Sequence, residues 1–463
     1  MIIDHVDRHA AAWSGLSGTR ADITRPGPTR TPMSADVVVA TSEDFMDRSS
    51  SPSGHSQAPG VDAEMQQPQV GTTGGVVRGR THSRGVLEFL GIPYGAPTGG
   101  EGRFRPPTPV SWTGVRDALE HGPSCPQPFG GDDATLAFFG GAEEPSQSED
   151  CLVLNVWTPA ADQGRRPVLV YLHGGGHVTG SGSWPAYQGA AMATRDAVVV
   201  TINHRLSALG YLDLEELLGA DYAASGTCGM LDVVAALEWV RDNAHAFGGD
   251  SSNVTVFGES GGGSKVVTLL AMPAAEGLFH RAVIQSGWFG LRCPTREQAA
   301  VTTQRFLDEL GLSRERAREV LTMPTQRLVE AVNALGGLGS GLEPVVDGVH
   351  IVSQPMDAVR AGALREIPLI IGSTHHEYSI FLPYITAAMP GDPIEASRTY
   401  LSSVFGPRVD DVVSSYRDAM PGAAEKDVLI AVATDGHVRE PAIRLAQDAV
   451  TTGADVYFYR FDF

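Results

Sequence analysis

The sequence predicts an α/β fold in which helices flank a mostly parallel β-sheet. Short apolar runs rich in β-branched residues, such as 168–172 (VLVYL) and 197–202 (AVVVTI), are typical of parallel strands that are buried on both faces. Segments with helical spacing lie between such runs, as at 230–244 (MLDVVAALEWVRDNA). Strand and helix patterns that alternate in this way indicate an α/β architecture.

The same alternation continues along the chain, without internal repeats. Further strands are expected at residues 253–258, 281–287, 368–373 and 456–461, and further helices at residues 262–272, 297–335 and 394–451. We expect these elements to form one domain over residues 67–463.

Residues 1–66 differ in composition from the rest of the chain. They include 48–60 (RSSSPSGHSQAPG), which is rich in Ser, Pro and Gly and has no sustained period of a helix or strand. Such a segment cannot bury enough apolar surface to offset the entropy lost on ordering, so we predict that residues 1–66 are disordered. The alternative is a wrongly assigned start, with Met33 or Met65 as the first residue.

The overall composition suits a soluble globular enzyme. Of 463 residues, 42% are hydrophobic and 19% are charged, and the formal net charge is −20. Nucleic acids and anionic membranes are bound by clustered Lys and Arg, so this charge argues against both kinds of partner. Nothing in the sequence indicates the oligomeric state.

The sequence shows no targeting segment and no metal motif. No apolar run reaches the roughly 18 residues that cross a bilayer. The first residues include Asp4, Asp7 and Arg8, where a secretory signal needs an apolar stretch. We expect a cytoplasmic protein, or a secreted one if the start is wrongly assigned. The four cysteines fit no zinc motif.

A Gly-x-Ser-x-Gly pattern lies at residues 257–263 (FGESGGG), with Ser260 at its centre. It falls between a predicted strand and a predicted helix, which is the setting of a nucleophile elbow. The turn would place Ser260 at a helix N-terminus, where developing negative charge is favoured. The alternative is a glycine-rich turn with an incidental serine.

A second glycine run, 173–177 (HGGGH), directly follows the predicted strand at 168–172. Esterases and lipases place an oxyanion-hole donor in such a loop and another on the residue after the serine. We therefore predict that the donors are the backbone N–H groups of Gly175, Gly176 and Gly261. A phosphate-binding loop is the alternative, but the run lacks the Lys-Ser/Thr ending of that motif.

Longer motifs make the chain resemble the type-B carboxylesterases, which belong to the α/β-hydrolases and include the cholinesterases. The motifs are 89–97 (FLGIPYGAP), 103–107 (RFRPP), 148–159 (SEDCLVLNVWTP), 247–263 (FGGDSSNVTVFGESGGG) and 277–287 (GLFHRAVIQSG). The resemblance implies an α/β-hydrolase fold and a hydrolase of small-molecule esters that uses Ser, Glu and His and needs no cofactor. It matches Ser260 to the nucleophile and Glu377, in 370–381 (IIGSTHHEYSIF), to the triad acid.

The resemblance also implies structural pairs. Cys125 and Cys151 match a family disulfide, which would contribute roughly 3.5 kcal/mol if it formed. Arg103 is expected to pair with Glu149, and Arg205 with Asp232. Cys228 and Cys293 are expected to be free and buried.

Three residues depart from the family pattern near the site. Gly261 replaces a more frequent Ala, which we interpret as a minor change. His177 stands where an aromatic or apolar residue usually lines the pocket, and His204 stands where the family favours Tyr. We expect that neither histidine breaks the chemistry.

The catalytic base is the main departure. His437 is the one histidine after Glu377, but its surroundings match a helix start with no catalytic role in the family. The family base follows the last strand, and the sequence ends at Phe463 on that strand. We therefore expect a chain truncated before its base, with activity impaired on the order of 10⁶ in kcat. His437 remains a substitute base by order alone.

Two further functions are compatible with these motifs. A non-catalytic binding protein on the same fold is the first, although such family members typically lose the serine. An enzyme that cleaves amides, carbamates or thioesters is the second, because these substrates share the acyl chemistry of esters.

Overall fold

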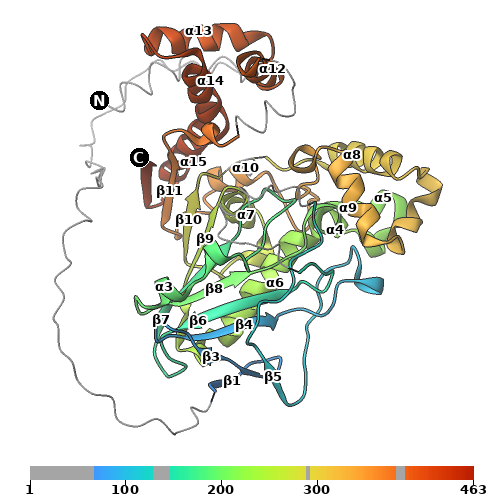
Figure 1. Cartoon of the computed structure of the whole chain (residues 1–463), viewed down its shortest axis with the longest axis vertical. Coiled ribbons are helices and arrows are strands. Elements are labelled where there is room, and N and C mark those ends of the chain that lie inside the picture. The colour runs from blue at the N-terminus through green and yellow to red at the C-terminus, as the bar shows by residue number, and fades with distance from the viewer. Residues whose placement is uncertain (1–66, 129–145, 288–291, 382–391, 463) are drawn as a thin grey trace, which may run out of the picture. The chain divides into compact units, whose positions relative to one another are not determined.

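The protein is described from a computed structural model that covers residues 67–128, 146–287, 292–381 and 392–462 (Figure 1). The segment predicted to be disordered, 1–66, lies outside the described residues. The described chain divides into two compact units, and each is presented by itself. One contains residues 67–375 and 437–462, and the other contains residues 376–436. One domain over 67–463 stays a prediction.

The larger unit is built on a nine-stranded sheet of order β12-β11-β10-β9-β7-β8-β6-β4-β3. Neighbouring strands are parallel from β12 to β8 and antiparallel from β8 to β3. The strands are β3 (Arg80–Thr81), β4 (Leu87–Pro93), β6 (Val153–Thr158), β7 (Arg166–Leu172), β8 (Val198–Ile202), β9 (Gly249–Glu259), β10 (Arg281–Gln285), β11 (Leu369–Thr374) and β12 (Val456–Phe461). The predicted α/β fold with a mostly parallel sheet is confirmed.

Burial of both faces of the sheet explains why the sequences of the central strands are mostly apolar. Every residue of β8 and of β6 is buried, so neither strand has a face that water would keep polar. A second, three-stranded sheet pairs β1 (Gln69–Gly71) with β2 (Val76–Arg78) and β2 with β5 (Val115–Asp117).

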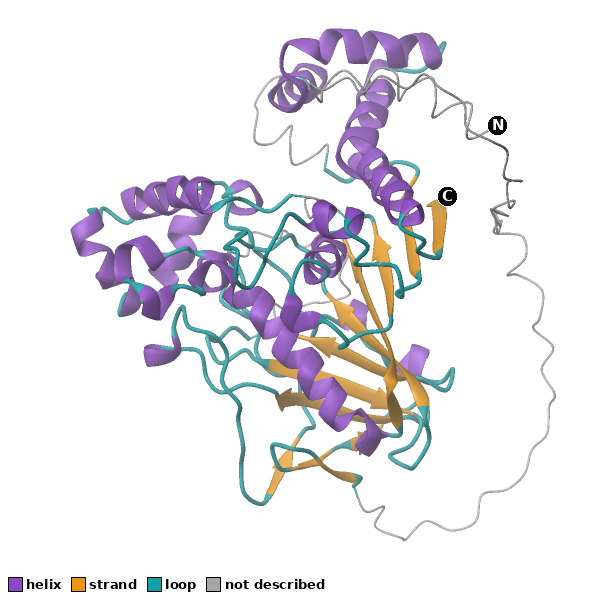
Figure 2. Cartoon of the chain, turned by 180° about the vertical axis from the view of Figure 1, so that it is seen from behind, coloured by secondary structure: helices purple, strands orange, loops and turns teal. Residues whose placement is uncertain are grey.

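Helices cover the large sheet, as both views show (Figures 1 and 2). α6 and α7 pack against β9, α3 packs against β6 and β8, and α15 packs against β11 and β12. Among the described residues of this unit, the α-helices are α3 (Ala190–Ala193), α4 (Ser207–Tyr211), α5 (Glu215–Leu218), α6 (Cys228–Asn243), α7 (Gly261–Leu269), α8 (Arg296–Glu309), α9 (Thr325–Ala334), α10 (Pro355–Arg360) and α15 (Glu440–Thr451).

The helical segment Ala220–Phe247, which contains α6, is long and apolar enough to cross a membrane by length and composition alone. Its most apolar window is 78% buried inside the fold, as in the core helix of a soluble protein. It is therefore weak evidence for a membrane span.

The smaller unit is helical. It contains the 3-10 helix η10 (Glu377–Ser379) followed by α12 (Pro393–Phe405), α13 (Val409–Ala419) and α14 (Glu425–Thr434). Its buried side chains include Tyr378, Leu401, Val413, Tyr416 and Leu429. Together with α15 of the larger unit, these helices confirm the predicted helical region 394–451 as a series of separate helices.

Candidate active site

Ser260 occupies the turn between β9 and α7. Its backbone has φ 54° and ψ −121°, a left-handed φ that is rare for a residue with a side chain. The Ser260 N–H donates to Gln285 O at 2.9 Å, and Ser260 O accepts the first helical hydrogen bond from Ser264 N–H at 3.0 Å. Strain of this kind is typical of functional positions. The predicted strand, turn and helix around the serine are confirmed.

The glycine segment, residues 174–176, directly follows β7. Gly175 and Gly176 have φ of +85° and +61°, which residues with side chains rarely adopt. Thr179 N–H donates to Gly175 O at 3.0 Å and fixes the far side of the loop.

The structure brings the glycine segment against the serine turn. A Cβ built on Gly174 would lie 3.5 Å from Ser260 Cβ and 2.9 Å from Glu259 Oε2. A Cβ on Gly261 would lie 2.3 Å from Gly176 O, so the two glycines touch through their backbones. Ser260, the predicted nucleophile, and the three predicted oxyanion donors, Gly175, Gly176 and Gly261, therefore lie close together.

Lys265 is a residue of this site that the sequence reasoning missed. It lies on α7, is 0% exposed, and donates from Nζ to His173 O at 3.1 Å and to Gly176 O at 2.8 Å. Burial lowers the pKa of Lys265 to about 7, and the Glu259 carboxylate acts in the opposite direction.

Three buried imidazoles surround this lysine. His173 and His204 stack with ring centroids 4.8 Å apart, and His177 meets Tyr211 edge-on at 5.3 Å. Burial and then the Lys265 charge lower the pKa of His173 to about 3 and hold the pKa values of His177 and His204 well below the usual range. All three are therefore neutral. The His177 side chain is thus buried, with its ring against Tyr211.

Comparison with known proteins fits this geometry. The profile of the Carboxylesterase family matches residues 66–463. The chain belongs to the carboxylesterase family. It is 38% identical over 406 residues to the para-nitrobenzyl esterase of Bacillus subtilis (strain 168), covering 86% of this chain and 79% of that protein. It is 34% identical to human carboxylesterase 3, covering 86% and 72% of the two chains.

Solved structures of carboxylesterases share the fold. The Geobacillus stearothermophilus carboxylesterase EST55 matches with a TM-score of 0.77 and 40% identity, over 85% of this chain and 80% of that one. A structure of para-nitrobenzyl esterase matches with a TM-score of 0.73 and 36% identity, over 86% and 80%. The predicted α/β-hydrolase fold is confirmed, and the protein is a carboxylic ester hydrolase by family.

The carboxylesterase places its two other candidate triad residues on separate elements. Glu377 begins η10 in the smaller unit, where the next residue, Tyr378, donates its N–H to Thr434 Oγ1 at 3.2 Å. His437 is half-buried in a π-helical turn, Asp435–Arg439, directly before α15. Their catalytic roles stay predictions.

Leu338 is a neighbour of the glycine segment that could not be derived from the sequence. It lies in the 3-10 helix η9 (Gly337–Gly339), is 51% exposed, and places Cδ2 3.0 Å from where a Gly176 Cβ would be. An exposed apolar side chain thus lies beside the predicted oxyanion donor.

Both predicted ion pairs of the carboxylesterase are confirmed. Arg103 Nε is 2.9 Å from Glu149 Oε2, and Arg103 also donates to Met323 O at 2.7 Å. Arg205 and Asp232 form a bidentate pair with distances of 2.8 and 2.6 Å, and both are fully buried.

The expected disulfide is not formed in the structure, which has all four cysteines as free, buried thiols. A hydrogen bond with Cys125 and burial raise the pKa of the Cys151 thiol, so the two sulfurs are neighbours. The disulfide stays a prediction for oxidising conditions. Cys228 and Cys293 are free and buried as predicted.

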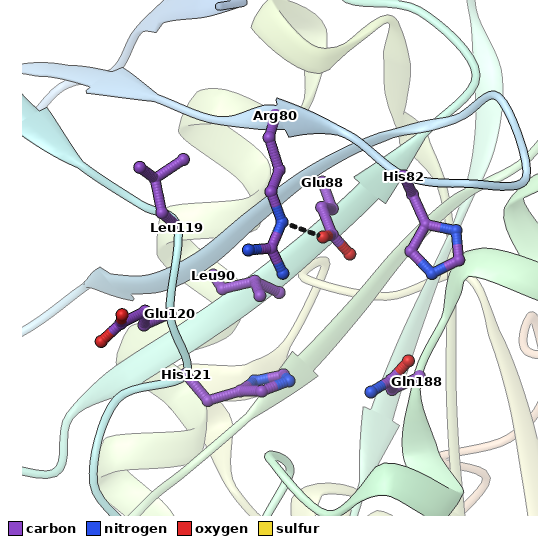
Figure 3. A pocket seen from close by; sticks show the side chains of 8 residues that line it. All are labelled: Arg80, His82, Glu88, Leu90, Leu119, Glu120, His121 and Gln188. Carbon is purple, nitrogen blue, oxygen red and sulfur yellow. Dashed lines mark hydrogen bonds and ion pairs between the residues drawn. The ribbon is translucent and has the colours of Figure 1, made fainter.

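A cavity of about 320 Å³ lies beside β3 and β4, the strands at one edge of the large sheet (Figure 3). Arg80 and Glu88, joined at 2.5 Å, lie on one side, and His121 and Gln188 lie on the other. Strands β6, β8 and β7 separate β4 from β9, so this cavity does not contain Ser260.

Proposed function

We propose that this carboxylesterase hydrolyses small-molecule carboxylic esters through an acyl-enzyme on Ser260. The observation that carries the proposal is the backbone contact between Gly261 and Gly176 beside the strained Ser260 turn. Two peptide groups from different loops thus lie beside the serine, which supports an oxyanion that accepts hydrogen bonds from both.

We propose the following steps. Ser260 Oγ attacks the ester carbonyl carbon as its proton passes to a base, and the N–H groups of Gly175, Gly176 and Gly261 stabilise the negative oxygen. The protonated base then gives its proton to the leaving alkoxide, and the acyl-enzyme forms. Water attacks the acyl carbon by the same route, releases the acid and restores Ser260.

The base is a histidine oriented by a carboxylate, for which we propose Glu377. His437 is the candidate by its order after Glu377 in the sequence. Loss of a triad base lowers kcat by about 10⁶, so His437→Ala should abolish turnover if His437 is the base, and activity within about twofold of the wild type would exclude it.

The first measurement is hydrolysis of p-nitrophenyl acetate and a para-nitrobenzyl ester by the protein and its Ser260→Ala variant. We expect hydrolysis that depends on Ser260. Hydrolysis that persists unchanged in Ser260→Ala would contradict the proposal.

A fluorophosphonate probe provides a second readout that needs no turnover. It labels an activated serine, which a non-catalytic binding protein on this fold need not have. Labelling that disappears in Ser260→Ala supports the enzyme, whereas no labelling of either chain supports the binding protein.

A further inference from the structure

Lys265 is unusual in this chain before its contacts are considered. The sequence has only two lysines, Lys265 and Lys426, although Lys and Arg together number 34. Lys426 is exposed on α14, whereas Lys265 is fully buried. Burial of an ammonium group costs free energy unless the group is paired or hydrogen-bonded, so the hydrogen bonds of Lys265 are what make its burial possible.

Those contacts lie at the two ends of the glycine segment. His173 O belongs to the peptide directly before residues 174–176, and Gly176 O belongs to the peptide directly after Gly176 N–H. One ammonium therefore holds both ends of a segment whose three glycines have no side chains to fix them. Because glycine loses more conformational freedom on ordering than any other residue, such a segment is poorly fixed without an external contact.

The charges around Lys265 leave the ammonium as the positive centre of the site. The imidazoles of His173 and His177, which flank the glycine segment, and of His204, on the loop after β8, are neutral. The carboxylate of Glu259, at the end of β9, raises the pKa of Lys265 and so favours its charged form. Hydrogen bonds from a charged donor are stronger than neutral ones, and a positive charge in a dry region favours a negative oxygen nearby.

We infer that Lys265 is a positioning residue of the oxyanion hole, which holds the glycine segment so that Gly175 and Gly176 direct their N–H groups at the oxyanion. The inference rests on the proposed function for its catalytic consequence. The holding of the glycine segment follows from the contacts alone and can be tested separately.

The variants are Lys265→Met, which keeps the approximate volume without the charge, Lys265→Arg, which keeps the charge, and Lys426→Met as the matched control. Far-UV circular dichroism and urea unfolding confirm that each variant folds. We expect Lys265→Met to lower the kcat for p-nitrophenyl acetate by about 10²–10³, as loss of an oxyanion donor does, with KM within about threefold. Lys265→Arg recovers part of the kcat, and Lys426→Met changes nothing.

Hydrogen–deuterium exchange of residues 173–177 tests the contact without any turnover. We expect faster exchange of this peptide in Lys265→Met than in the wild type and Lys426→Met. Equal exchange in all three proteins overturns the inference. If Ser260 supports no hydrolysis at all, the proposed function fails, and faster exchange still supports the contact.

The pH profile separates positioning from proton transfer. With only two lysines, ¹³C,¹⁵N-lysine labelling gives two sets of side-chain NMR signals, so the Lys265 titration can be followed directly beside that of Lys426. We expect kcat of the wild type to fall as pH rises through the Lys265 transition, because the ammonium is lost, and this limb to be absent in Lys265→Arg. A rate that instead rises through that transition, with Lys265→Arg as inactive as Lys265→Met, would make Lys265 the base and overturn the positioning role.

Discussion

Gly261 and Gly176 touch through their backbones, and a Cβ on Gly261 would lie 2.3 Å from Gly176 O. This contact joins the serine turn to the glycine segment. It changes the interpretation of Gly261, which the sequence suggested was a minor departure from Ala. With the glycine segment in this position, a side chain at residue 261 would collide with the backbone of Gly176.

Gly261→Ala should therefore impair catalysis without unfolding the protein. Its Cβ pushes the glycine segment away from Ser260, and we expect kcat to fall by at least about tenfold and by up to about 10²–10³ if one donor is lost. Gly71→Ala is the control, because a Cβ there meets nothing within 4 Å. Steady-state kinetics on p-nitrophenyl acetate measure both variants. Equal kcat values for both would show that the loop moves freely.

Leu338 should set the size of the acyl group. Truncation in Leu338→Ala opens space beside Gly176, and we expect the ratio of kcat/KM for butyrate over acetate esters to rise roughly tenfold, a typical effect of pocket size. Val301→Ala serves as control, because Val301 is 63% exposed on α8. An unchanged ratio in Leu338→Ala would place the acyl chain elsewhere.

Lys265 should make stability depend on pH. Its pKa is lowered from 10.5 to about 7 on folding, so between these values the unfolded chain binds the additional proton. The contribution of Lys265 to stability is fully present above pH 10.5 and is lost as pH falls through about 7. Urea unfolding of wild type and Lys265→Met should show the wild type gaining relative stability as pH rises from 7, by up to about 5 kcal/mol. Parallel stability curves for the two proteins would contradict this.

The buried pair of Arg205 and Asp232 should tolerate joint replacement better than the loss of one partner. Asp232→Asn leaves a buried guanidinium without its counter-charge, and we expect a loss of about 3–5 kcal/mol in the free energy of unfolding. Arg205→Met combined with Asp232→Leu should be less destabilising. Arg316→Ala, which breaks an exposed pair with Glu319, should cost less than about 1 kcal/mol.

The neighbouring thiols of Cys125 and Cys151 should join on oxidation. Thiol titration in denaturant should give four free thiols for reduced protein and two after mild oxidation. The oxidised protein should be more stable by roughly 3.5 kcal/mol. The variant Cys125→Ser should lose both effects.

Much of the fold could be predicted because the central strands are buried on both faces, which leaves continuous apolar runs in the sequence. The start of β9 was missed by four residues, since Gly249 pairs with Arg166 across a register shift and the residues before 253 are polar. The pairing of residues that are distant in the sequence leaves no local pattern of apolar and polar residues. Helical spacing predicts the helices of the smaller unit, but no change in amino-acid composition shows where this unit begins and ends.

The site was predictable where short motifs carry it and not where distant residues meet. The turn at Ser260 and the glycine segment each have a local pattern. The contact of Lys265 with His173 spans 92 positions, and a lysine in a helical stretch ordinarily indicates an exposed face. Leu338 likewise reaches Gly176 only through the folded chain.

The scarcity of lysine has a practical consequence. Amine-reactive reagents attach to exposed side-chain amines, and Lys426 on α14 is the one such amine, because Lys265 is buried. Apart from the terminal amine, a resin or fluorophore would couple at a single site, so all molecules immobilised through a side chain would be held at the same residue.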